Sequence, residues 1–356
     1  MDPEGARNPV FRVGLLISMP PLSAPSRQAT GTVDAAARQA GFLGTGSFVP
    51  EGRLTNADLE AMVDTSDAWI LERTGIRERR KAGSGLTASM MGAEAGRRAM
   101  AAAGVSTVDA IIVATCTGDS RIPSTACLVQ RSLGLDGVAA FDINAACSGF
   151  LYGLILSRSL IATGAAETVL LIGSEALTTY IDYTDRSTCV LFGDGAGAVV
   201  VGAVAAGGVR AVRWAASGAN SDLIYYGPKD GEPDTMNAMR MAGKGTFRMA
   251  VERLTEVASD VCADAGWRAE DIDLVVPHQA NLRIMEAVTK RLGVPMERVM
   301  VNIDRMGNTS AASIPVAMAE AADTSRVRNG DRVLLMAFGS GVTWGAVALE
   351  WTGQPA

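Results

Sequence analysis

Cys147 is the residue whose type and surroundings best suit covalent chemistry, and His278 and Asn308 are the side chains to be considered with it. Cys147 lies in NAACSGF, after an apolar run that ends near Ala145 and just before an apolar helical pattern. A thiol at a helix start faces free N–H groups and the positive end of the helix dipole, which lower its pKa from about 8.5. We therefore expect Cys147 to be an activated nucleophile. The alternative is a buried structural cysteine, which we expect for the other four, Cys116, Cys127, Cys189 and Cys262.

His278 is the only histidine of the chain and lies in VVPHQANLRI, at the end of an apolar strand pattern. Ligands of α/β sheets gather outside the carboxyl ends of the strands, where His278 is predicted to lie. A single histidine cannot form a zinc site on its own. The side chain is therefore a candidate acid, base or hydrogen-bond donor. The alternative is a histidine satisfied in the core or on the surface.

Asn308 lies in GNTSAAS, a tight turn before a helical segment of small residues. Its amide can donate hydrogen bonds to a substrate oxygen. Its spacing alone favours the alternative, a turn or helix-cap residue.

The elements that must position these side chains form an α/β pattern, in which helical segments alternate with short Val/Ile/Leu-rich strands from Gly41 onward. Two pairs of stretches echo each other: VDAIIVAT (108–115) with IDLVVPH (272–278), and TVLLIGSEA (168–176) plus FGDGAGAVVVG (192–202) with the segment 332–351. These echoes predict a duplicated domain, with halves at 41–208 and 209–356. Residues 1–40 lack periodicity and are expected to be a disordered extension. The Gly- and Asp-rich stretch 215–245 is expected to be a long functional loop.

Composition excludes several classes of protein. The net charge is −6, whereas general nucleic-acid binders carry a basic excess. No apolar run reaches the ~18 residues of a membrane span, and the short run 13–19 lacks the flanks of a signal peptide. The five cysteines are scattered, without CxxC or metal-ligand spacing. We expect a cytoplasmic protein with reduced thiols.

Together, NAACSGF, VVPHQANLRI and GNTSAAS resemble the three active-site motifs of β-ketoacyl-acyl-carrier-protein synthase III. LGTGSFVPE, the segment 55–80, LFGDGAGAVVVG and FGSGVTWGA resemble further segments of that family in the same order. The resemblance implies the thiolase fold, in which two pseudo-repeated α/β halves form a layered α-β-α-β-α core. Relatives on this fold that need two catalytic histidines are excluded by the histidine count.

The resemblance also implies the chemistry: a decarboxylative Claisen condensation of an acyl-CoA starter with malonyl-acyl-carrier protein, which initiates fatty acid synthesis. Cys147, His278 and Asn308 would be the catalytic triad. Backbone N–H groups of Cys147 and Ser340 would form the oxyanion hole. No metal or redox cofactor is implied, since the acyl carrier protein brings its own phosphopantetheine.

Further residues match family positions. Those expected to bind CoA are Trp69, Arg73, Arg186 and Asn281. Those expected at the acyl pocket are Ile122, which would reach the partner's pocket across a homodimer, and Phe192. Those expected to dock the acidic carrier protein are Arg248, Arg283, Lys290 and Arg291.

Two alternatives remain at this point. One is a starter-unit synthase of a polyketide or quinolone pathway. The other is an acyl transferase or thioesterase on the same fold, against which Asn308 argues, because simple acyl transfer has no need of that amide.

Overall fold

Two β-sheets organise the computed structural model, which describes residues 38–228 and 238–353. The first sheet has the order β1 (Gln39–Phe48), β7 (Asp194–Val204), β6 (Thr168–Ala176), β4 (Ala110–Ala114) and β5 (Ala139–Ile143). The second has the order β8 (Gly208–Ala216), β13 (Thr343–Glu350), β12 (Arg332–Gly339) and β11 (Leu274–Pro277).

The two sheets repeat one pairing scheme. Strand β4 runs parallel to β6, and β11 runs parallel to β12. The next pairs, β6 with β7 and β12 with β13, are antiparallel, as are the outer pairs β1 with β7 and β8 with β13. The echoed segments of the sequence therefore occupy equivalent strands. The boundary between 208 and 209 itself stays a prediction.

The start of the first strand differs slightly from expectation. Residues 1–37 lie outside the described part of the chain, but Gln39 and Ala40 already pair with Val204 and Ala203 in the first sheet. The expected extension therefore ends no later than residue 38, because Gln39 and Ala40 already belong to strand β1.

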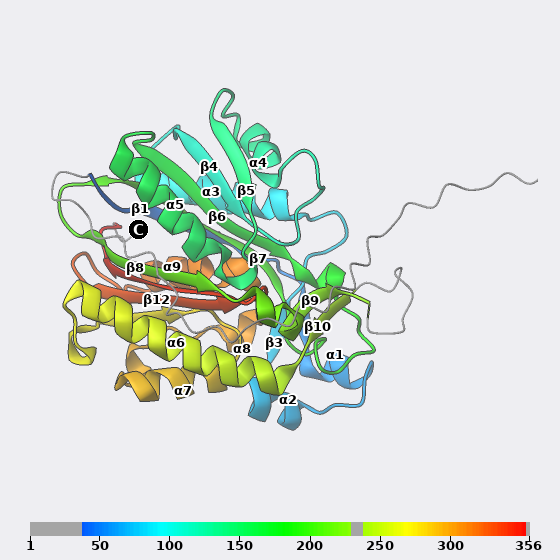
Figure 1. Cartoon of the computed structure of the whole chain (residues 1–356). Helices are drawn as coiled ribbons and strands as arrows, with labels where there is room; N and C mark the ends of the chain where they lie inside the picture. Colours follow the sequence, from blue (N-terminus) through cyan, green and yellow to red (C-terminus); the bar gives the residue numbers. More distant parts are fainter. Residues whose placement is uncertain (1–37, 229–237, 354–356) are drawn as a thin grey trace, which may run out of the picture.

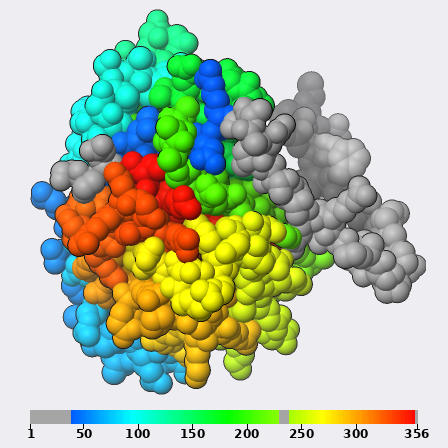
Figure 2. Space-filling view, turned by 90° about the vertical axis from the view of Figure 1, so that its left-hand side faces the viewer, coloured from blue at the N-terminus to red at the C-terminus, as the bar shows by residue number. Residues whose placement is uncertain are grey.

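Helices complete five layers, in the predicted α-β-α-β-α order (Figure 1). Helices α3 (Ala88–Ala103) and α4 (Thr125–Leu133) cover the outer face of the first sheet. Helices α5 (Gly149–Thr163) and α9 (Ser313–Asp323) lie between the sheets, and α6 (Gly243–Ala265) and α7 (Leu282–Leu292) cover the second. In the space-filling view, a red patch from the C-terminal end of the described chain lies between a cyan and green surface and an orange and yellow surface (Figure 2).

The middle layer holds a core that both halves share. Phe150, Leu151 and Leu154 of α5 are fully buried there, together with Val199 of β7 and Leu335 of β12. The stretch Ala146–Thr163 is long and apolar enough to cross a membrane by length and composition alone, contrary to the expectation that no run reaches that length. Its burial between two sheets identifies it as a core helix.

Two glycines let the chain around α9 approach the first sheet closely. A Cβ on Gly173 of β6 would lie 2.2 Å from the Ala311 carbonyl oxygen, and one on Gly197 of β7 would lie 2.5 Å from the Pro315 backbone. No side chain fits at these distances. The sequence following Asn308 is therefore seated directly on strands of the first half.

Several short elements gather at one end of the molecule (Figure 1). They are β2 (Arg53–Thr55), α1 (Asn56–Glu60), α2 (Asp67–Thr74), β3 (Glu78–Arg80), β9 (Ile224–Gly227), β10 (Ala238–Met241) and α8 (Ile303–Met306). Helix α2 begins where Ser66 Oγ accepts a hydrogen bond from the Trp69 N–H, and ends at left-handed Gly75. The predicted loop 215–245 includes the β9–β10 hairpin, with 229–237 outside the described residues.

Candidate active site

Cys147, His278 and Asn308 line one cavity of about 550 Å³. Cys147 lies in the 3₁₀ turn Ala146–Ser148 that leads into α5, His278 follows β11 directly, and Asn308 follows α8. The cavity is otherwise mainly apolar, and its wall includes Val190, Leu191, Phe192, Ile224, Met239, Met241, Phe247, Ala250, Leu254, Ile284 and Phe338. The structure thus brings together the three side chains singled out by sequence, from both halves of the chain.

Close backbone packing holds the turn around Cys147. Ala146 has a left-handed φ of 46°, a strained conformation for a residue with a side chain. A Cβ on Gly339, at the end of β12, would lie 2.8 Å from the Cys147 backbone nitrogen. Ser340, which follows Gly339, lines the cavity, and its Oγ donates to the Ile224 carbonyl at 2.5 Å. The backbone near Ser340 is therefore close to the backbone of Cys147.

The thiol of Cys147 differs from the sequence-based expectation. Desolvation by burial raises its pKa to about 11; a hydrogen bond from Ser310 opposes the rise, while the charge of Glu175 adds to it. The expected lowering by the helix start does not prevail, because the cysteine is held in a short 3₁₀ turn inside an apolar cavity. In the free enzyme, Cys147 is therefore a thiol at neutral pH.

His278 is buried, with 5% of its surface exposed, and its Nδ1 lies 2.6 Å from Ser313 Oγ. Burial lowers the pKa of the imidazole to about 3. The ring is therefore neutral at physiological pH, so that one nitrogen carries a proton and the other a lone pair.

Asn308 is held by its backbone. Its N–H donates to the Leu191 carbonyl at 2.9 Å, its carbonyl accepts from the Gly193 N–H at 2.9 Å, and its Oδ1 accepts from the Ser310 N–H at 2.9 Å. Asn308 is thus a turn residue, as the alternative interpretation held. Among the described residues, no hydrogen bond of its Nδ2 is found, so this amide group can still donate into the cavity.

A buried acid, which no sequence pattern singles out, contacts a residue of the cavity wall. Glu175, at the end of β6, is fully buried and accepts hydrogen bonds from the Thr117 hydroxyl at 2.5 Å and the Cys116 N–H at 3.2 Å. Burial raises the pKa of its carboxyl group. The Cys116 thiol, 3.3 Å from Glu175, is half-buried and lines the cavity, which corrects its assignment as a buried structural cysteine. No sequence pattern signals these contacts, because they join residues far apart in the chain.

Trp69 and Arg73, both expected to bind CoA, line the cavity, and Arg186 lies against Trp69. The Arg73 and Arg186 guanidinium carbons each lie 5.0 Å from the centre of the Trp69 ring. Arg186 also donates to the Asp64 carbonyl at 2.7 Å. A planar, cationic surface of this kind suits an aromatic base and phosphates.

Asn281 has a structural role in addition to the one expected. Its Oδ1 accepts from the Arg283 N–H at 2.9 Å, which caps α7, and its Nδ2 donates to the Arg73 carbonyl at 2.9 Å. The side chain lines the cavity but is committed to joining α7 to α2.

The remaining predicted residues divide between the cavity and the surface. Phe192 is buried in the cavity wall and pairs with Asn308 through a β-bridge. Ile122 is 89% exposed and does not line the cavity of its own chain. The predicted docking residues Arg248, Arg283, Lys290 and Arg291 are all exposed on α6 and α7, and Arg283 lies at the cavity wall against the Phe247 ring. In the described ranges, no group of three or more His, Cys, Asp or Glu side chains is arranged to hold a metal ion.

Comparison with known proteins points in the same direction. Residues 141–218 match the family model of 3-oxoacyl-[acyl-carrier-protein] synthase III, and residues 262–351 match the model of its C-terminal part. A relative from Erythrobacter litoralis, named beta-ketoacyl-[acyl-carrier-protein] synthase III, is 48% identical over 319 residues, which cover 88% of this chain and 99% of the relative.

Solved structures agree. The crystal structure of 3-oxoacyl-[acyl-carrier-protein] synthase III from Aquifex aeolicus VF5 is 47% identical, with a TM-score of 0.84, and the match covers 88% of this chain and 100% of that one. The priming beta-ketosynthase from the R1128 polyketide biosynthetic pathway is 34% identical, with a TM-score of 0.85, over 90% of this chain and 98% of that one.

Proposed function

The chain belongs to the beta-ketoacyl-[acyl-carrier-protein] synthase III family, and we propose that it condenses an acyl-CoA starter with malonyl-acyl-carrier protein, releasing CO2 and forming 3-oxoacyl-acyl-carrier protein. This condensation would start fatty acid synthesis. The observation that carries the proposal is the convergence of a thiol, a neutral imidazole and an amide donor in one apolar cavity.

In the first half-reaction, the Cys147 sulfur loses its proton and attacks the acyl-CoA thioester, the bond from the acyl carbon to the CoA sulfur breaks, and CoA leaves as its thiol while Cys147 retains the acyl group as a covalent intermediate. Negative charge develops on the thioester oxygen. The backbone N–H groups of Cys147 and Ser340 would stabilise this charge. The close approach of Gly339 to the Cys147 nitrogen supports this oxyanion hole, because it brings the two backbone segments together.

In the second half-reaction, malonyl-carrier protein loses CO2 and leaves an enolate, whose negative oxygen needs hydrogen-bond donors. His278 and the Nδ2 group of Asn308 would supply them. A neutral histidine suits this role, since it donates a hydrogen bond without giving up its proton. The enolate carbon then attacks the acyl group on Cys147, and the sulfur departs.

The substrates would enter past the basic outer rim. Trp69, Arg73 and Arg186 would hold the nucleotide of CoA, and Arg283 and Arg248 would contact the carrier protein, followed by Lys290 and Arg291 along α7. Carrier proteins are generally acidic, so exposed cations near the cavity favour docking despite the net charge of −6.

A homodimer is part of the same proposal. Strand β5 lies at the edge of the first sheet and exposes 38% of Phe141, and the nearby loop exposes Ile122. Apolar side chains beside an open strand edge favour pairing with a second copy. Ile122 would then reach the partner's acyl pocket, and its size would admit branched or medium chains as well as acetyl.

The proposed cycle uses no metal or redox cofactor, because a thiol, an imidazole, an amide and backbone donors supply every step. A cytoplasmic location also belongs to the proposal. The five cysteines are free, as expected in a reducing compartment.

Priming of a polyketide pathway is the second candidate, favoured by the similarity to the R1128 ketosynthase structure. The TM-scores of 0.84 and 0.85 do not separate the two functions, whereas identities of 47% and 34% favour fatty acid synthesis.

The deciding experiment incubates the protein with acetyl-CoA and malonyl-acyl-carrier protein and analyses the carrier protein by mass spectrometry. Formation of 3-oxobutyryl-carrier protein, with an acyl group mapped to Cys147, supports the proposal. Acyl transfer to water or to another acceptor without loss of CO2 contradicts it. A series from acetyl- to octanoyl-CoA then tests starter width, and strict preference for acetyl would refute the role given to Ile122.

A further inference from the structure

Ser313 is the immediate partner of the only histidine. It begins α9, is 2% exposed, and its Oγ lies 2.6 Å from His278 Nδ1. A hydroxyl and a neutral imidazole nitrogen can bond in either direction. The hydroxyl donates if Nδ1 has a lone pair, and accepts if Nδ1 carries the proton. The direction decides which nitrogen of His278 carries a proton toward the cavity.

A second hydrogen bond to the same oxygen constrains that direction. The backbone N–H of Gln279 donates to Ser313 Oγ at 3.3 Å. One lone pair of the hydroxyl is thereby used, and the hydroxyl proton still needs an acceptor. Within the described ranges, His278 Nδ1 is the only acceptor found for it.

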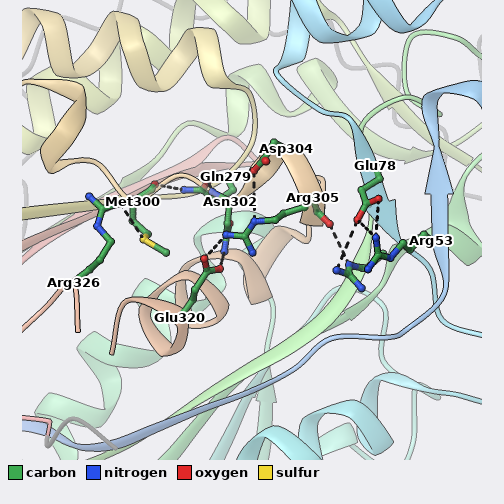
Figure 3. A network of polar contacts seen from close by, with 10 residues as sticks. Arg53, Glu78, Gln279, Met300, Asn302, Asp304, Arg305, Glu320 and Arg326 are labelled. Carbon is green, nitrogen blue, oxygen red and sulfur yellow. Dashed lines mark hydrogen bonds and ion pairs between the residues drawn. The ribbon is translucent and has the colours of Figure 1, made fainter. Parts of the chain in front are cut away.

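The side chain of Gln279 keeps this N–H in place. It is fully buried, and its Nε2 donates to the carbonyls of Pro277 at 2.9 Å and Met300 at 3.0 Å. Its Oε1 accepts from the Asn302 N–H at 3.0 Å. Figure 3 shows Gln279 and Asn302 side by side above α9. The Gln279 side chain is thus held by Pro277, Met300 and Asn302, and these bonds fix the orientation of the backbone N–H that donates to Ser313.

Helix α9 also anchors the other end of this network. Glu320 lies seven residues after Ser313 and therefore on the same helix face. It accepts from Asn302 Nδ2 at 3.0 Å and pairs with Arg305, three residues before Asn308 (Figure 3). One face of one helix thus holds the His278 ring, the loop after it and the segment leading to Asn308.

Two arrangements of protons remain to be compared. If Nδ1 carried the proton, the buried Ser313 hydroxyl would accept twice and its own proton would have no acceptor, at a cost of about 1–3 kcal/mol. If Nε2 carries the proton, the Gln279 N–H, the Ser313 hydroxyl and Nδ1 are all satisfied: the Gln279 N–H donates to Ser313, and Ser313 donates to Nδ1.

We propose that Ser313 is a positioning residue that fixes the tautomer of His278, with the proton on Nε2 and facing the cavity. In the opposite tautomer, Nε2 would present a lone pair and would repel the enolate oxygen instead of stabilising it. The catalytic consequence rests on the proposed function; the tautomer itself does not.

The lone histidine makes the tautomer directly observable. Protein labelled with ¹⁵N-histidine and prepared without a histidine tag has a single imidazole, and the resonance positions of its two nitrogens report which one is protonated. We expect Nε2 to be protonated and Nδ1 to be bare in the wild-type protein at neutral pH. A protonated Nδ1 would overturn the proposal, whatever the activity.

The matched variants are Ser313→Ala and Ser157→Ala. Both remove the hydroxyl of a buried serine on a middle-layer helix, but Ser157 donates to the Gly153 carbonyl at 2.8 Å, within α5. We expect Ser313→Ala to shift the ¹⁵N spectrum toward a mixture of tautomers and to slow CO2 release from malonyl-carrier protein at least about tenfold; a wrong tautomer can cost up to about 10⁴. Ser157→Ala should leave both unchanged.

Acylation of Cys147 by acyl-CoA separates this role from a general loss of structure. It should proceed at the wild-type rate in Ser313→Ala, because His278 acts in the other half-reaction. An unchanged spectrum in a folded Ser313→Ala variant would contradict the proposal. If that variant does not fold, the wild-type spectrum still decides. An Nε2–H tautomer in a protein that condenses no substrate would contradict the proposed function alone.

Discussion

The two sides of the cavity are held in place by different means. On the side of Cys147, backbone segments approach one another where side chains are missing, as at Gly339, and Ala146 takes up a left-handed φ. On the side of His278, buried polar side chains form a continuous set of hydrogen bonds through Ser313, Gln279, Asn302 and Glu320.

This difference separates the two chemical roles. The nucleophile needs space, because a whole acyl group must reach the sulfur. The donors for the enolate need fixed direction, because misaimed hydrogen bonds lose most of their strength. Added volume should therefore damage acyl transfer, and lost hydrogen bonds should damage decarboxylation.

The largest expected effect comes from removing one reacting group on each side. Cys147→Ala should abolish acylation but still release CO2, because the two donors remain. Asn308→Ala should slow CO2 release by about 10²–10³-fold and still accept an acyl group, because the thiol and its oxyanion hole remain. Labelled CO2 release and acyl-enzyme mass measure the two half-reactions.

Cys262→Ala, on the buried side of α6, is the control and should behave as the wild type. Normal decarboxylation by Asn308→Ala would leave Asn308 as a turn residue only, and the case for carbon–carbon bond formation would weaken with it.

The pH dependence of the thiol comes next in size. The thiolate is the reactive form, and a pKa of about 11 leaves it scarce at neutral pH. Alkylation of Cys147 by iodoacetamide should therefore accelerate about tenfold per pH unit, or about 10²-fold between pH ~7 and ~9. Peptide mass spectrometry follows Cys147 separately from the other cysteines. A rate that is already constant above neutral pH would mean that the pKa is low, as the sequence suggested.

Gly339→Ala tests the importance of space. The added Cβ would meet the backbone nitrogens of Cys147 and Ser148 at 2.8 and 3.0 Å, so the turn or the strand must move. A displacement of ~1 Å in a reacting group can cost about 10²-fold. We expect a loss of this order in acylation and a smaller loss in CO2 release, measured by the same two assays. Gly104→Ala, with open space around its Cβ but a left-handed φ of 67°, controls for stability alone. Equal losses in both half-reactions would contradict the division between the two sides.

Gln279→Met tests the polar side at similar side-chain volume. It leaves two carbonyls and one N–H without partners, which should lower the free energy of unfolding by about 2–4 kcal/mol. CO2 release should fall about tenfold, with acylation preserved. Gln130→Met on α4 loses one hydrogen bond, to the Val138 carbonyl, and is the matched control. If Gln279→Met lowered the free energy of unfolding but left CO2 release unchanged, as expected for Gln130→Met, Gln279 would have a structural role only. The proposed link between the polar side and decarboxylation would then be wrong.

The smallest effect is expected at the rim, outside both regions. Reversing Arg283 and Lys290 to Glu should raise the KM for malonyl-carrier protein several-fold and leave acylation by acyl-CoA intact, because rim charges mainly affect encounter. Glu286→Lys, an exposed change on the same helix, is the opposite-sign control and should not raise that KM. Equal loss in both half-reactions would exclude α7 as a docking surface specific to the carrier protein.

Sequence patterns were informative where a site residue lies in a short segment with a clear pattern of apolar and turn residues. The strand before His278, the turn at Asn308 and the helix after Cys147 all occur where apolar periodicity and turn residues placed them. The duplicated strands were also visible, since buried strands keep similar apolar runs in both halves.

Properties that depend on packing were not accessible in this way. The prediction that the pKa of Cys147 is lowered was wrong, because desolvation in the folded cavity outweighs the effect of the helix start. Glu175 and Ser313 were missed, since each acts on a residue that is remote in sequence. Asn281 appears as a ligand by its position in a motif, whereas its hydrogen bonds show that it also joins two helices.

The close backbone contacts at Gly173 and Gly197 affect how the protein unfolds. They press the segment after Asn308 onto strands of the first half, and the shared middle-layer core extends the same contact. If either half unfolded, the buried apolar side chains that it covers on the other half would be exposed to water. We therefore expect calorimetric melting in one cooperative transition, and we expect that neither half expressed alone would be a stable protein, despite the duplication that the sheets preserve.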